Sequence, residues 1–98
     1  MSSMPKIDVY NVYCELFQNK RDNSINLLVN AIETHDIETV ILAAVDATLK
    51  TFDVDLYIIL VEEFCVQPST FQLRVKEDTI DEYRLFMRQI RLRNILNE

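Results

Sequence analysis

Residues 37–51 read IETVILAAVDATLKT, and this stretch decides the fold class of the chain. Its apolar residues recur at steps of three and four, which is the period of an α-helix. They also spread over most of the helical circumference, and a helix that is apolar nearly all round is buried nearly all round. Asp36 precedes the stretch and suits the N-cap position, because its carboxylate can accept a free backbone N–H. We therefore predict that 37–51 is the central helix of the protein.

A narrow polar wedge interrupts this apolar surface at Glu38, Thr39, Asp46 and Lys50. Asp46 and Lys50 are four residues apart, a spacing that brings opposite charges together on a helix surface. We expect these two side chains to form a weak ion pair on the exposed edge of the central helix.

Further helices are predicted on both sides of the central one. Before it, apolar residues at helical spacing indicate helices at about 6–19 and 25–32, separated by a polar run. After it, Thr79 and Glu82 have the spacing of a capping box, which opens a last helix at about 80–97. Each of these helices has an apolar side that the central helix can cover.

The segment 54–76 is the ambiguous part of the sequence. Residues 56–61 (LYIILV) resemble a buried strand, and residues 71–76 (FQLRVK) alternate as a half-exposed strand does. A hairpin would need a connection without Gly, however, and an isolated two-stranded sheet is marginally stable. Ser69 and Gln72 also have the spacing of a capping box. We favour helix here over a hairpin.

The fold class expected is therefore all-α. We predict a compact bundle of four to five helices around 37–51, forming a single helical domain over residues 1–98. The alternative is an α+β fold with a small hairpin in 54–76.

Charge and composition argue against several kinds of partner. The 98-residue chain has 16 acidic and 10 basic residues and a net charge of −6. Residues 22–65 hold nine acids and one base, so most of the surface field repels DNA, RNA and anionic lipid. The longest apolar run, 56–61, is far shorter than the ~20 residues that cross a bilayer. We expect no membrane partner, and nucleic acid is a disfavoured one.

Catalytic and cofactor chemistry have little support in the sequence. The chain has no Gly, and phosphate-binding loops need Gly where the backbone approaches the phosphate oxygens. His35 is the single imidazole, and no recognisable nucleophile motif accompanies it. Cys14, Cys65 and His35 are too few for a zinc site and include no closely spaced pair. We expect no enzyme activity, no cofactor, no metal and no small-molecule substrate.

The two cysteines bear on the compartment. No apolar stretch of a secretory signal precedes Asp8, so Cys14 and Cys65 are expected to be reduced and buried rather than paired. The protein is then expected in the cytoplasm, or in the interior of a host cell.

The last helix carries two apolar arcs, which is one more than a terminal helix needs to attach to its own domain. The first arc consists of Ile80, Tyr83, Met87 and Ile90, and the second of Leu85, Leu92 and Leu96. A stripe of three arginines lies between the two arcs. Either both arcs are buried within one subunit, or the second arc covers the surface of another chain.

We predict a non-catalytic, regulatory protein–protein interaction module that forms a homodimer and binds another protein. The residues predicted to bind the partner all lie on the last helix: Arg84, Leu85, Arg88, Arg91, Leu92 and Leu96. Two alternatives stay open. One is nucleic-acid binding through the arginine stripe, and the other is mimicry of nucleic acid by the acidic side chains of residues 22–65.

Overall fold

The structure, a computed structural model, describes residues 6–19 and 24–96 and has no strand within them. Its helices are α1 (Lys6–Gln18), α2 (Ser24–Thr34), α3 (Ile37–Thr51), α4 (Val54–Glu62), α5 (Pro68–Arg74) and α6 (Ile80–Leu96), with a 3-10 turn, η1 (Glu77–Thr79), before α6. The all-α fold class is confirmed. The alternative hairpin in 54–76 is wrong, because α4 and α5 occupy that segment. Since these two helices are separate, the described residues form six α-helices, one more than expected.

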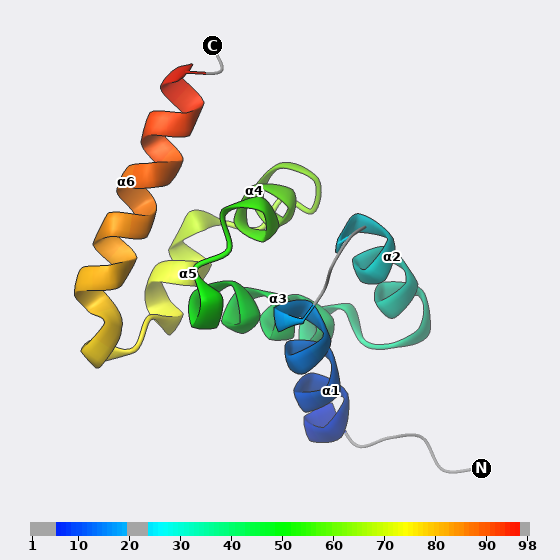
Figure 1. Cartoon of the computed structure of the whole chain (residues 1–98). Coiled ribbons are helices and arrows are strands. Elements are labelled where there is room, and N and C mark those ends of the chain that lie inside the picture. Colours follow the sequence, from blue (N-terminus) through cyan, green and yellow to red (C-terminus); the bar gives the residue numbers. More distant parts are fainter. Residues whose placement is uncertain (1–5, 20–23, 97–98) are drawn as a thin grey trace.

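Helix α3 lies at the centre of the fold and is contacted by α1, α2, α4 and α5 (Figure 1). Its bounds are those predicted, and Asp36 caps it by accepting a hydrogen bond from the Thr39 backbone N at 3.2 Å. The residues of α3 that are buried are Val40, Ala43, Ala44, Val45, Ala47 and Thr48. Ile37 departs from the prediction, because it lies in the first turn and is 56% exposed.

The core forms where large side chains of the surrounding helices meet the small side chains of α3. The most extensive contact is between α1 and α3, and the three alanines of α3 are all fully buried. The fully buried large side chains come from α1, α2, α4, α5 and α6: Phe17, Leu28, Leu56, Leu60, Phe71 and Phe86. Thr48 is buried among them, and its hydroxyl donates to the Ala44 carbonyl oxygen at 2.8 Å, so its burial leaves no unsatisfied donor.

The turn between α3 and α4 is made without glycine. Phe52 takes the left-handed conformation at the end of α3, with φ at 50°, a position that other chains give to Gly. This conformation costs a non-glycine residue about 1–2 kcal/mol. The Phe52 ring offsets the cost through its contact with Phe86, at 5.4 Å between centroids. Asp53 then caps α4 by accepting from the Leu56 backbone N at 3.1 Å.

The N-termini of α5 and α6 differ in detail from the capping boxes predicted at Ser69 and Thr79. Helix α5 begins at Pro68, and its N-cap Gln67 makes no side-chain capping bond. Pro is pre-organised for the first helical position, so Ser69 falls inside the first turn and its predicted capping box is wrong. Thr79 lies in η1, and its hydroxyl donates to the Lys76 carbonyl oxygen at 2.9 Å.

Both cysteines are free, as predicted, but only Cys14 is buried. Cys65 is exposed, so the expectation of two buried thiols is wrong for this residue. The reason is that α4 ends at Glu62, and Cys65 lies in the following loop with φ at 56° rather than on the apolar side of a helix.

A matched pair of substitutions tests this core. Leu60 is fully buried in α4, whereas Leu73 is 85% exposed on α5. We expect Leu60→Ala to lower the free energy of unfolding by about 2–5 kcal/mol, because it leaves a cavity in the core. Leu73→Ala should change it by less than about 0.5 kcal/mol. Urea unfolding followed by circular dichroism measures both values, and equal losses would contradict the assigned core.

Candidate functional site

Helix α6 attaches to the rest of the molecule through the face that carries Phe86. The Phe86 ring contacts those of Phe52 and Tyr57, with centroids 5.4 and 5.6 Å apart. Near the other end of the helix, Arg93 pairs with Asp55 of α4 at 2.9 Å. Figure 1 shows α6 at one side of the molecule, across from α2. The attachment therefore uses one arc of α6 and leaves the opposite arc open to solvent.

The leucines predicted for the partner surface lie on this open arc. Leu85 is 61% exposed and Leu92 is 53% exposed. They are seven residues apart, so both point to the same side of the helix. Ile90, from the other apolar arc, is buried instead. The side chain of Leu96 lies outside the part of the chain whose side chains are described.

The arginine stripe is exposed along the same helix. Arg84, Arg88 and Arg91 all reach solvent. Arg84 pairs with Asp81 at 3.6 Å, and both side chains are well exposed. An exposed pair of this kind contributes at most about 1 kcal/mol, so it leaves the arginine available for other contacts.

Charge is polarised along α6 and η1. The acidic residues precede the helix or lie in its first turn: Glu77, Asp78, Asp81 and Glu82. The basic residues follow over the later turns: Arg84, Arg88, Arg91 and Arg93. This order suits the helix dipole, whose positive end is at the N-terminus. It also makes one end of the open arc acidic and the other end basic.

Four residues of the open arc follow one another at steps of four, three and four: Asp81, Leu85, Arg88 and Leu92. Alternating steps of four and three are the spacing of the contact positions of paired helices, where apolar side chains pack against the partner helix. We call these four residues the α6 seam. The seam combines two exposed leucines with one charge of each sign.

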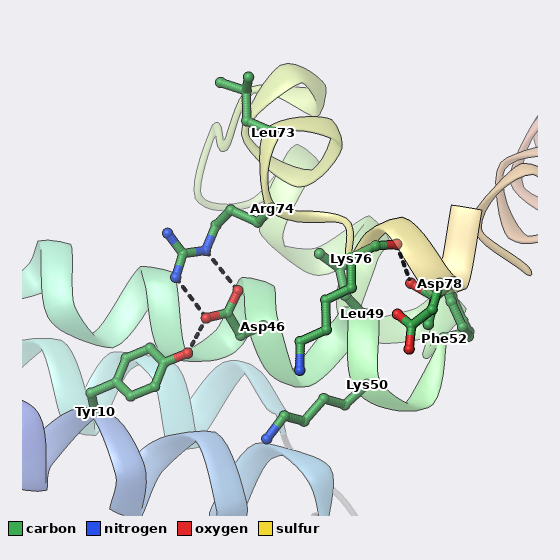
Figure 2. Close-up of a pocket in the computed structure, with 10 residues that line it drawn as sticks. Tyr10, Asp46, Leu49, Lys50, Phe52, Leu73, Arg74, Lys76 and Asp78 are labelled. Carbon is green, nitrogen blue, oxygen red and sulfur yellow. Dashed lines mark hydrogen bonds and ion pairs between the residues drawn. The ribbon is translucent and has the colours of Figure 1, made fainter.

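A second cluster joins α1, α3 and α5, and Figure 2 shows the forked pair of contacts between Arg74 and Asp46 at its centre. Arg74 of α5 donates to both carboxylate oxygens of Asp46, from Nε at 2.6 Å and from Nη2 at 2.7 Å. The hydroxyl of Tyr10 on α1 donates to the same carboxylate. The predicted pairing of Asp46 with Lys50 is wrong, because a planar guanidinium satisfies both oxygens at once and a single ammonium does not.

The cluster shifts the pKa of its members. Burial alone would raise the pKa of the Asp46 carboxyl, but hydrogen bonds from Arg74 and Tyr10 and the charges of Arg74 and Lys50 hold it below its ordinary value of 3.8. Burial and the hydrogen bond to Asp46 raise the pKa of Tyr10 to about 12. The hydrogen bonds to Asp46 also raise the pKa of the Arg74 guanidinium. At neutral pH the cluster is therefore an ion pair with a neutral phenol.

The cluster forms one wall of a pocket of about 650 Å³. Its lining comes from α1, α3, α5, η1 and the residues before η1: Tyr10, Asp46, Leu49, Lys50, Phe52, Leu73, Arg74, Lys76, Asp78 and Thr79. Sequence analysis missed the pocket because these segments are far apart in the chain. One signal was present, since Asp46 is an acid on an otherwise apolar stretch of helix, and such residues are rarely buried without a partner.

Comparison of the chain with protein-family models, with curated proteins and with solved structures finds no match. Among the residues that the structure describes, no helix combines the length and apolar character needed to span a bilayer. In that same part of the chain, no three His, Cys, Asp or Glu side chains are grouped so that they could hold a metal ion.

The Asp46 cluster predicts a specific dependence of stability on pH. Because the pKa of Asp46 is lower in the folded state, its carboxylate stabilises the fold fully above pH 3.8, and this contribution is lost as the pH falls through the lower folded value. We expect Asp46→Asn to lower the free energy of unfolding at neutral pH by about 1–3 kcal/mol, through the weakened charged hydrogen bonds. The variant should also lose less stability on acidification than the wild type.

Asp81→Asn is the matched control, because the Asp81 carboxylate is well exposed and its only described ion pair is the weak one with Arg84. We expect this control to follow the wild-type curve closely. Urea unfolding at a series of pH values measures all three proteins. Parallel curves for wild type and Asp46→Asn would contradict the proposed stabilising role of the cluster.

Proposed function

We propose that this chain is a non-catalytic protein–protein interaction module that self-associates through the α6 seam. The observation that carries the proposal is the exposure of Leu85 and Leu92, at 61% and 53%, on the arc of α6 that faces away from the core. Complete burial of a leucine side chain is worth about 1.5–3 kcal/mol relative to exposure. Covering both leucines with another helix is therefore favourable.

A second copy of α6 is the partner that the charges of this face favour. A two-fold dimer places one surface patch opposite itself. In an antiparallel pair, the acidic start of one helix, at Asp81, lies near the basic end of the other, at Arg91. Leu85 of one copy then faces Leu92 of its partner. A parallel pair would bring like charges together at both ends, so we propose the antiparallel arrangement.

The proposed interface is small. Helix α6 has 17 residues, and a helix of this length spans about 25 Å. Such an interface falls below the standard size of stable complexes, so the self-association is expected to be reversible. We expect a dissociation constant of about 100 µM for the dimer, which corresponds to a binding free energy of roughly −5.5 kcal/mol. Another protein that presents a longer helix to the same seam would displace the second copy, which is how the module would act as a regulator.

The two alternative functions are less well supported. Acidic residues occupy the start of the helix that carries the arginine stripe, and the chain has a net charge of −6, so both oppose the approach of a polyanion. Mimicry of nucleic acid would need the carboxylates of residues 22–65 to be available. Several of them serve the fold instead, by capping helices or binding arginines: Asp36, Asp46, Asp53 and Asp55.

We further propose that the module acts in a reducing compartment such as the cytoplasm. Cys14 and Cys65 are both free, and unpaired thiols are typical of proteins in reducing compartments. The exposed Cys65 would be at risk of forming intermolecular disulfides in an oxidising one.

Sedimentation equilibrium tests the dimer. We expect the wild type to shift from monomer to dimer over the high-micromolar range. Leu85→Asp with Leu92→Asp should leave a folded monomer, because both positions are exposed and the charges would face each other across the seam. Leu73→Asp is the control, since Leu73 is even more exposed but lies on α5. A wild type that stays monomeric, or a control that dissociates equally, would overturn the proposal.

A charge swap tests the orientation. Asp81→Arg alone or Arg91→Asp alone should weaken the dimer several-fold, because each places like charges together in the antiparallel pair. The double variant restores opposite charges across the interface, and we expect its association to return toward the wild-type value. Failure of the double variant to recover, with helicity intact by circular dichroism, would rule out the antiparallel arrangement.

A further inference from the structure

The pocket beside the Asp46 cluster holds two lysines, neither of which forms an ion pair with a described carboxylate. Lys50 lies in the last turn of α3, and Lys76 lies between α5 and η1. Figure 2 shows their ammonium groups extending to the same side of the pocket, toward Tyr10. Within the described part of the chain, no carboxylate is within ion-pair distance of either ammonium. These two cations are therefore free to meet an anion.

The charge balance of the pocket supports an anionic ligand. Asp46 is already matched by Arg74 through two short hydrogen bonds. Asp78 is the other carboxylate in the lining, and Figure 2 shows it beside Phe52, away from the lysine ammonium groups. The pocket thus has a local excess of positive charge, although the chain carries −6 overall. At physiological salt, exposed charges are screened over about 8 Å. A bound anion is therefore influenced mainly by the charges that line the pocket, and less by the distant acidic residues of the chain.

The pocket also has an apolar wall. Leu49, Phe52 and Leu73 contribute to its lining, and Leu73 is 85% exposed at its rim. A volume of about 650 Å³ lies within the range of sites that hold small organic molecules. A ligand that fits both features carries an anionic group at one end and an apolar group at the other.

The Asp46 cluster gives this pocket a defined shape. Arg74 is anchored to α3 through Asp46; in the chain it follows Leu73 directly and precedes Lys76 by two residues. The anchor therefore holds the segment that carries the apolar rim and one of the lysines against the helix that carries the other lysine. A pre-formed arrangement of this kind lowers the entropic cost of binding.

We propose that the pocket binds a small-molecule phosphate monoester that carries an apolar or aromatic group. The phosphate lies between Lys50 and Lys76, because a dianion makes use of two ammonium groups where a single carboxylate needs one. The apolar group lies against Leu49, which Figure 2 shows beside Lys76. The site is separate from the α6 seam, so it does not depend on the proposed self-association.

Phenyl phosphate is the probe for this proposal, added to the isotope-labelled full chain and followed by NMR. We expect saturable shifts of the backbone amides of Leu49, Lys50 and Lys76, with a dissociation constant on the order of 1 mM. Inorganic phosphate should move the two lysine amides with several-fold weaker binding, because it lacks the apolar group. Phenol should give no saturable shift at the lysines.

A charge-matched pair of variants separates a specific site from general attraction. Lys50→Gln with Lys76→Gln should weaken phenyl phosphate binding at least tenfold. Asn26→Asp with Asn30→Asp lowers the net charge of the chain by the same amount on α2, away from the pocket and the α6 seam, and should leave binding unchanged. All four side chains are exposed, so both variants should fold, and circular dichroism checks this. Equal losses in the two variants, or no saturable shift in the wild type at millimolar probe, would overturn the proposal.

Discussion

The burial of α3 is the constraint on which the rest of the structure depends. Its alanines and valines are buried against the surrounding helices, so little of its circumference is left for polar groups. Asp46 lies on this helix and must find its partners on other elements. Its partners are Arg74 of α5 and Tyr10 of α1. These contacts connect three helices and form one wall of the pocket.

The packing of four helices around α3 also explains why α6 has an open side. With α1, α2, α4 and α5 already against α3, the last helix attaches mainly to α4 and to the Phe52 turn. One arc, centred on Phe86, is enough for that attachment. Leu85 and Leu92 on the other arc have no surface of their own chain to cover. The two proposed surfaces, the α6 seam and the pocket, thus have the same origin, because both lie at the edge of the group of helices that packs around α3.

The sequence was most informative where local signals agreed. The bounds of α3 were predicted because a capping Asp36 and a continuous apolar surface point to the same helix. Residues 54–76 were ambiguous because LYIILV has no helical stripe, as expected for a segment surrounded on several sides. In the structure, two local features accompany the helical conformation of this segment: Asp53 caps α4, and Pro68 lies in the first turn of α5.

By itself, then, the sequence determined the helical class, the central place of 37–51 and the second apolar arc of the last helix. These features follow from the spacing of apolar residues, and spacing is a local property of the chain. Only the tertiary structure decided that Asp46 pairs with Arg74 and Tyr10 rather than with Lys50, and that Lys50 and Lys76 share a pocket. The physical reason is that these contacts depend on how separate helices are placed around α3, and no periodicity within one helix records that placement.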